Sequence, residues 1–215
     1  MIYGVTYASR VALEYNIRNC EVVVRVVDTY TEELFVAGAV VVLIGTLSTA
    51  YGQTNFTVTS IEEWKRFIIK GNGIEAFGNT LQAIARDKES VHGGERQTQG
   101  ITGSWLQAGG NATNAVATNL ELAGALIDGQ KLNVFGSGIQ SFGAALEANA
   151  TLVLMENDLE VLGYGASSIG ALLDSIGTFF VLKGSEQRGN HILMIASWIQ
   201  VIGAILVVVG LVGIQ

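Results

Sequence analysis

Residues 131–158 carry the side chains whose types and spacing come closest to a cofactor site. Leu132–Phe135 could form a short strand, and Gly136-Ser137-Gly138 would follow it as a phosphate-binding turn. About 20 residues further on, the carboxylate of Glu156 or Asp158 would bind the ribose of a dinucleotide. The segment therefore suggests a dinucleotide-binding enzyme as one interpretation of the chain.

Two observations weigh against that enzyme. Ser141 replaces the third glycine of the motif, and the alternating strands and helices of a complete nucleotide-binding sheet are missing elsewhere in the sequence. His92 and His191 each lie in a polar turn without a second ligand at metal-binding spacing. We therefore predict no enzymatic activity, no catalytic residue, no cofactor and no metal, and we identify no small-molecule substrate. The dinucleotide-binding enzyme is kept as the third interpretation.

Two polar residues interrupt otherwise apolar stretches of the sequence. Asp174 lies within Ile169–Leu182, and Gln200 lies within the uncharged segment Ile192–Ile214. A carboxyl group in such a place is either a hydrogen-bonded structural residue or a functional intramembrane carboxylate, and both interpretations stay open. An amide in hydrocarbon needs a partner, so Gln200 should face another helix.

Glycine recurs every seven residues along most of the chain, which contains 27 glycines. Seven residues are about two helical turns, so each run forms a stripe on one helix face where another backbone can approach closely. We expect leucine at Gly170 or Gly177 to disrupt this packing and alanine to be mild. The glycines that we assign to the helix-packing seam are Gly38, Gly45, Gly78, Gly110, Gly136, Gly143, Gly163, Gly170, Gly177, Gly203 and Gly210.

A polar residue stands three positions before several of these glycines. Such a residue would lie at the edge of the stripe, where it either makes an interhelical hydrogen bond or is solvated. The residues in this position are Glu75, Gln107, Gln140, Glu160 and Gln200, and Glu121 stands in the same way before Gly124, which is outside the seam set.

The motif Ile199-Gln200-Val201-Ile202-Gly203 and its copies give the chain a resemblance over residues 31–215. It resembles uncharacterised repetitive proteins of Gram-positive spore-forming bacteria, which carry tandem Ile-Gln-x-Ile-Gly heptads. The resemblance implies a helical protein from a bacterial source, and it implies no activity or site.

Apolar runs separated by polar turns predict about six helices in an all-α fold of antiparallel hairpins with glycine-lined heptad seams. The expected helices lie near residues 31–50, 60–87, 101–127, 131–155, 159–182 and 191–215. Residues 1–30 should form a separate N-terminal arm, irregular or β-like at Glu21–Val27. The remaining predicted parts are a first helical hairpin at 31–87, a polar linker at 88–100 and a repetitive four-helix region at 101–215.

Composition favours contact with lipid or with other copies of the chain. Hydrophobic residues make up 49% of the sequence and charged residues only 14%, and the mean hydropathy is +0.42. Leu34–Leu47 and Ile192–Ile214 are the segments that look transmembrane. The net charge of −7 and the scattered basic residues exclude a nucleic-acid partner.

We therefore expect a non-enzymatic, membrane-associated, self-assembling helical-repeat scaffold. Its partners would be membrane lipid and other copies of itself, and its place would be the bacterial cell membrane, with a cytoplasmic assembly as the alternative. The alternative function is that of a small membrane-active protein of the holin-like or pore-forming kind.

Overall fold

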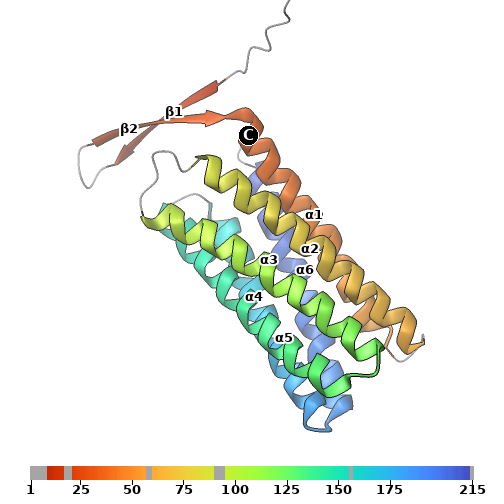
Figure 1. Ribbon diagram of the computed structural model, residues 1–215. Coiled ribbons are helices and arrows are strands. Elements are labelled where there is room, and N and C mark those ends of the chain that lie inside the picture. Colours follow the sequence, from red (N-terminus) through yellow and green to blue (C-terminus); the bar gives the residue numbers. More distant parts are fainter. Residues whose placement is uncertain (1–8, 17–20, 57–59, 90–94, 155–156, 214–215) are drawn as a thin grey trace, which may run out of the picture.

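Six α-helices follow a short β-hairpin in the structure, a computed structural model that describes residues 9–16, 21–56, 60–89, 95–154 and 157–213 (Figure 1). The all-α fold class is confirmed. The elements are β1 (Ser9–Asn16), β2 (Glu21–Asp28), α1 (Thr29–Thr54), α2 (Ile61–Glu89), α3 (Glu95–Leu122), α4 (Leu126–Leu154), α5 (Asp158–Leu182) and α6 (Glu186–Gly213).

The β-like segment predicted at Glu21–Val27 is strand β2, which pairs with β1 in an antiparallel register that places Ser9 opposite Asp28. Strand β2 continues directly into α1.

The six helices form a closed ring. Each helix packs against the helix before it and the helix after it in the sequence, and α1 packs against α6. Successive helices are antiparallel, so the ring consists of three hairpins: α1 with α2, α3 with α4, and α5 with α6 (Figure 1).

Glycines bring the two backbones of each hairpin into contact. A methyl group added at Gly38 would lie 2.8 Å from the carbonyl oxygen of Gly78, and one added at Gly78 would lie 2.7 Å from that of Gly38. The same reciprocal contact joins Gly103 to Gly143 and Gly163 to Gly203. The three hairpins therefore repeat one packing geometry.

All eleven glycines assigned to the seam lie at these hairpin contacts, where an added methyl group would meet atoms of the partner helix. Most helical glycines outside the heptad spacing behave differently, because a methyl group would have nothing within 4 Å; these are Gly73, Gly109, Gly138, Gly165 and Gly213. Gly100 is an exception, since a methyl group there would lie 2.8 Å from Nη1 of Arg86.

Several helix ends differ from the expected ones. The turn expected at Asp128-Gly129 forms instead around Gly124, whose φ of 93° suits the left-handed end of α3. Gly184, with a φ of 80°, ends α5 in the same way, so α6 begins at Glu186 rather than near His191. The acidic side chains of Asp128 and Glu186 lie in the first turns of their helices, where the helix dipole favours them.

Helix α3 begins at Glu95, within the stretch expected to be a polar linker, and residues 90–94 of that stretch lie outside the described residues. The division into a hairpin at 31–87 and a four-helix region at 101–215 stays a prediction. In the ring, α2 packs against α3 and α1 packs against α6.

Candidate functional site

The interior of the ring is polar and its outer surface is apolar. In the described part of the chain, the largest fully buried side chains are all polar: Gln82, Glu147, Asn111, Thr31, Thr151, Ser104 and Ser137. Large hydrophobic side chains are exposed on every helix, among them Ile44, Phe77, Trp105, Phe142, Leu162 and Ile202. A water-soluble domain shows the opposite distribution.

Hydrogen bonds between helices that are not neighbours in the ring cross its axis. Gln140 Nε2 on α4 donates to Gln200 Oε1 on α6 over 2.8 Å. Near the ring end that holds the N-terminus of α1, Gln82 Nε2 on α2 donates to the hydroxyl oxygen of Tyr164 on α5 over 3.3 Å. These bonds place the polar side chains on the axis of the bundle.

Both polar residues singled out in the apolar stretches contribute to a layer of side chains midway along the axis. Ser137 Oγ donates to Asp174 Oδ2 over 2.6 Å, and Thr49 Oγ1 donates to Glu75 Oε1 over 2.8 Å. We define the mid-bundle layer as the six residues Thr49, Glu75, Asn114, Gln140, Asp174 and Gln200. They help to enclose a cavity of about 10 Å³, which is room for about one water molecule.

The repeat explains why these residues meet. Side chains four positions apart lie on the same side of a helix. Each residue of the mid-bundle layer stands four positions after a small seam residue, so the three hairpins supply equivalent pairs. The pairs are Thr49 with Glu75, Asn114 with Gln140, and Asp174 with Gln200, following Gly45 and Gly71, Gly110 and Gly136, and Gly170 and Ala196.

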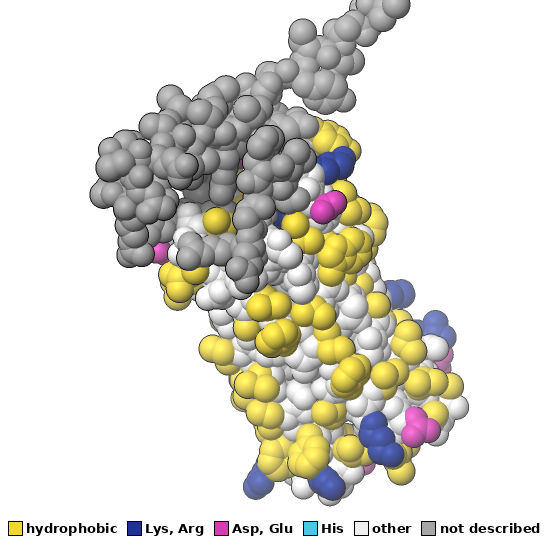
Figure 2. Space-filling view, turned by 60° about the vertical axis from the view of Figure 1, so that its left-hand side comes forward, with side chains coloured by type: hydrophobic (Ala, Val, Ile, Leu, Met, Phe, Trp, Pro, Cys, Tyr) yellow, Lys and Arg dark blue, Asp and Glu magenta, His cyan; other side chains and the backbone are white. Residues whose placement is uncertain are grey.

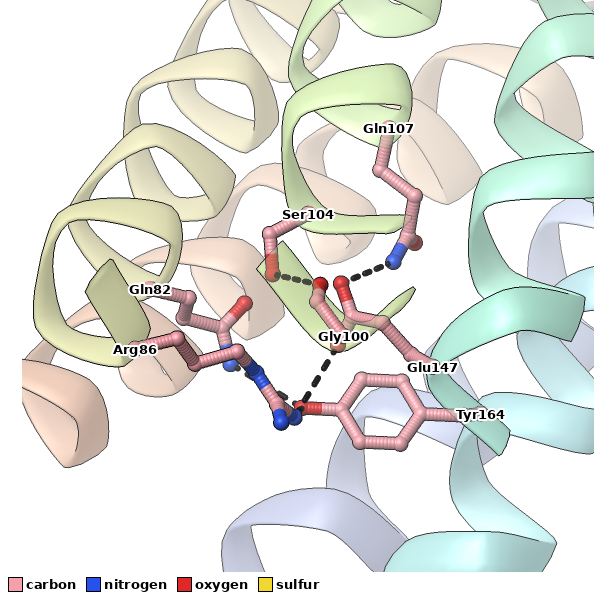
Figure 3. A network of polar contacts seen from close by, with 7 residues as sticks. All are labelled: Gln82, Arg86, Gly100, Ser104, Gln107, Glu147 and Tyr164. Carbon is pink, nitrogen blue, oxygen red and sulfur yellow. Dashed lines mark hydrogen bonds and ion pairs between the residues drawn. The ribbon is translucent and has the colours of Figure 1, made fainter. Parts of the chain in front are cut away.

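Figure 3 shows a second polar cluster, whose side chains point toward one another. It lies toward the ring end that holds the N-terminus of α1, because Arg86 is in the last turn of α2, which runs antiparallel to α1. Arg86 Nη2 lies 3.4 Å from Glu147 Oε2, and both side chains are buried. Gln107 Nε2 donates to the other carboxylate oxygen of Glu147 over 2.8 Å, and Arg86 Nη2 also donates to the hydroxyl of Tyr164. Helices α2, α3, α4 and α5 therefore meet in one network around a buried ion pair.

An ion pair also lies near the opposite end of the ring. Lys65 Nζ on α2 lies 2.6 Å from Glu121 Oε2 on α3, and both side chains are almost completely buried. Burial raises the pKa of Glu121, and the hydrogen bond and charge of Lys65 oppose that rise. The two ion pairs thus lie on either side of the mid-bundle layer.

The polar residue three positions before a glycine, which the sequence shows at Glu75, Gln107, Glu121, Gln140 and Gln200, was the useful signal. Of the two interpretations left open, the structure supports interhelical hydrogen bonding for Glu75, Gln107, Glu121, Gln140 and Gln200. Sequence reasoning missed Arg86, Glu147, Lys65 and Asn114. Asn114 and Glu147 stand three positions before the alanines Ala117 and Ala150 rather than before a glycine, and Lys65 and Arg86 lie outside the motif. Which helices face one another was also not known.

The segment proposed to bind a dinucleotide is helical. Leu132–Phe135 and Gly136-Ser137-Gly138 lie inside α4, so the predicted strand and its phosphate-binding turn are wrong. Gly136 packs in the seam, whereas a methyl group on Gly138 would meet nothing within 4 Å. Asp158 begins α5, and Glu156 lies outside the described residues. The heptad therefore accounts for Gly136 without a cofactor.

Three helices are long and apolar enough to cross a membrane: α1 from Tyr30, α5 and α6. Two of them contain the segments that the sequence singled out, Leu34–Leu47 and Ile192–Ile214 as far as Gly213. Helix α5 qualifies despite Asp174, whose carboxylate is hydrogen-bonded to Ser137 on α4.

The fold and the polar axis define an all-α protein of six antiparallel helices with three candidate membrane spans. The chain belongs to DUF6944, a family of unknown function, whose family model matches residues 33–208. No curated protein and no solved structure matches the chain. The resemblance to the repetitive proteins of spore-forming bacteria stays a prediction.

Proposed function

We propose that the protein is an integral membrane protein whose six helices all cross the bilayer and whose polar axis gives small cations a route through it. The observation that carries this proposal is the inverted polarity of the ring. Polar side chains hydrogen-bond across the axis, whereas large hydrophobic side chains point outward on every helix.

The outward surface supports a place within the bilayer. Figure 2 shows hydrophobic side chains along the visible face, with charged side chains near the two ends and along the right-hand edge. In five helices the stretch free of exposed charge is long enough for the roughly 30 Å of hydrocarbon. In α2 that stretch lies between Lys70 and Asp87 and measures about 24 Å at 1.5 Å per residue, and Lys70 can extend its ammonium group to the interface.

The mean hydropathy of α2, α3 and α4 is too low to mark them as membrane spans, because it includes polar residues that are buried inside the ring and do not meet lipid. On α2 these residues include Asn72, Glu75, Asn79, Gln82 and Arg86, each at most 6% exposed. In a ring of this kind, the neighbouring helices satisfy such side chains and lipid meets only the outer face.

The charge of the interior favours cations. Among the described side chains, the buried and partly buried carboxyl groups outnumber the two buried basic groups, those of Lys65 and Arg86. The acids are Glu75, Glu121, Glu147, Glu160 and Asp174. An acidic lining attracts cations and repels anions.

The ring also bears on the choice between the two membrane functions expected from the sequence, the self-assembling scaffold and the pore-forming protein. The glycine faces are used within one chain, and α1 closes the ring against α6, so a second copy is not needed to cover them. The proposal therefore favours the pore-forming alternative over the self-assembling scaffold. We still expect the protein to associate with copies of itself and to lie in the bacterial cell membrane.

The test is ion flux in liposomes that contain the purified protein. Loss of a proton or potassium gradient should be faster than in protein-free liposomes, while a trapped disaccharide should be retained. The variant Gln200→Leu, which makes the axis less polar, should slow the flux. The control Ile202→Leu, on the outer face of the same helix, should not. Flux no faster than in protein-free liposomes would contradict the proposal.

A further inference from the structure

We propose that the mid-bundle layer is a proton-binding site, in which the carboxyl groups of Glu75 and Asp174 take up and release protons that move along the polar axis. This inference rests on the proposed function, because it names the cation and the residues that carry it.

The threefold repeat shows that these two acids are not needed to build the layer. At the position of Glu75 the other two hairpins have Gln140 and Gln200, and at the position of Asp174 they have Thr49 and Asn114. The same packing geometry therefore accepts a neutral amide or hydroxyl group at each place. Glu75 and Asp174 are therefore the two residues that give the mid-bundle layer groups able to ionise.

The size of the enclosed cavity favours a proton over a metal cation. Its volume of about 10 Å³ holds about one water molecule and leaves no room for a hydrated sodium or potassium ion. A proton needs only one water molecule and groups that can exchange it. Uptake forms an O–H bond on a carboxylate oxygen and turns a hydronium ion into water, and release reverses the step, so no electrons are transferred.

The contacts of the two acids leave them able to exchange a proton. Each accepts one hydrogen bond from a hydroxyl group, Glu75 from Thr49 and Asp174 from Ser137. Neither forms an ion pair with a described residue, so protonation breaks no salt bridge. The charged groups that act on them are also acids, since Asp174 repels Glu75 and Glu121 repels Asp174.

A further side chain of the same cavity, Asn114, supports the hydrogen bond that Asp174 accepts. Asn114 lines the cavity and is 2% exposed. Its Nδ2 donates to Ser137 Oγ, which in turn donates to Asp174. Its Oδ1 lies in the seam, where a methyl group added at Gly136 would meet it. Asn114 therefore supports the layer through the Ser137 hydroxyl that donates to Asp174.

The experiment uses the full chain in liposomes with a pH-sensitive dye inside and a potassium gradient with valinomycin to set the membrane potential. Wild-type protein should move protons and not sodium. Glu75→Gln and Asp174→Asn introduce residues that the repeat already holds at equivalent positions, so the ring should fold. Each should slow proton flux about tenfold or more, because a neutral amide cannot carry a proton at this step. The matched control Glu62→Gln, at an exposed acid of α2, should leave it unchanged.

The outcomes separate the inference from the proposed function. Unchanged proton flux in both neutral variants would overturn the inference and leave the route for cations standing. Sodium flux as fast as proton flux would do the same. No cation flux in wild-type protein would overturn both.

A measurement on the wild type keeps the inference testable if the variants fail to fold. Dicyclohexylcarbodiimide, an apolar reagent that adds to protonated carboxyl groups, should label Glu75 or Asp174 and stop proton flux. Labelling confined to other residues would overturn the inference.

Discussion

Two buried acids of this protein, Glu121 and Glu147, pair with basic side chains from other helices. Arg86 and Glu147 form the clearest pair, because Arg86 lies on α2 and Glu147 on α4, and their side chains are 7% and 0% exposed. Taking two charges out of water costs several kcal/mol per ion before their mutual attraction is counted. At the residue scale, the pair therefore stabilises the ring only while both members are present.

Removing one member should be costly. We expect Arg86→Ala to lower the free energy of unfolding by about 3–5 kcal/mol, because it leaves Glu147 buried without its counter-ion. The matched control is Arg66→Ala on the same helix. The pair of Arg66 with Glu62 is exposed, and its loss should cost less than about 1 kcal/mol. Denaturant unfolding in detergent micelles measures both, and equal losses in the two variants would show that the buried pair is not needed.

Each hairpin is built on close approach between two backbones. The carbonyl oxygens of Gly38 and Gly78 lie so near the opposite glycine that even one methyl group would meet them within 2.8 Å. The sequence led us to expect alanine to be mild in the seam, and the structure differs. At Gly170 an added methyl group would lie 2.9 Å from the carbonyl oxygen of Ala196. A backbone cannot move aside as a flexible side chain can, so the helices must separate.

Two glycines of α2 give a direct test at the element scale. Gly78→Ala should lower the free energy of unfolding by about 1–3 kcal/mol, because it overpacks the seam. Gly73→Ala should raise it by about 0.5–1 kcal/mol, because a methyl group there meets nothing within 4 Å and alanine favours the helix. Thermal unfolding of the two variants compares them. Stabilisation by both substitutions would rule out the tight seam.

The helices and their seams were predictable because both follow from local spacing. The heptad placed the seam glycines, and the polar position before Gly78 or Gly143 marked side chains that point to the axis. Helix ends were less predictable, because Gly124 and Gly129 are both turn-compatible and only one adopts the left-handed conformation. Pairs such as Arg86 with Glu147 depend on the order of helices around the ring, which local spacing does not contain.

At the scale of the whole molecule, the proposed place within the bilayer depends on closure of the ring. Contact between α1 and α6 completes an enclosure whose interior holds the polar side chains and whose exterior holds the large hydrophobic ones. An isolated hairpin would expose its polar face to lipid. The complete ring encloses the polar side chains and lets residues such as Gln140 and Gln200 hydrogen-bond to each other across helices, away from lipid.

The most direct test of this account is the accessibility of nitroxide spin labels in lipid bilayers. Labels would be placed singly at Phe142 and Ile202 on the outer face and at Arg188 near an end of the ring, after replacement of Cys20 by serine. Oxygen concentrates in lipid, and a nickel chelate stays in water. The account predicts that labels at Phe142 and Ile202 collide mainly with oxygen and the label at Arg188 mainly with the nickel chelate. Labels at Phe142 and Ile202 that are as accessible to nickel as the label at Arg188 would contradict it.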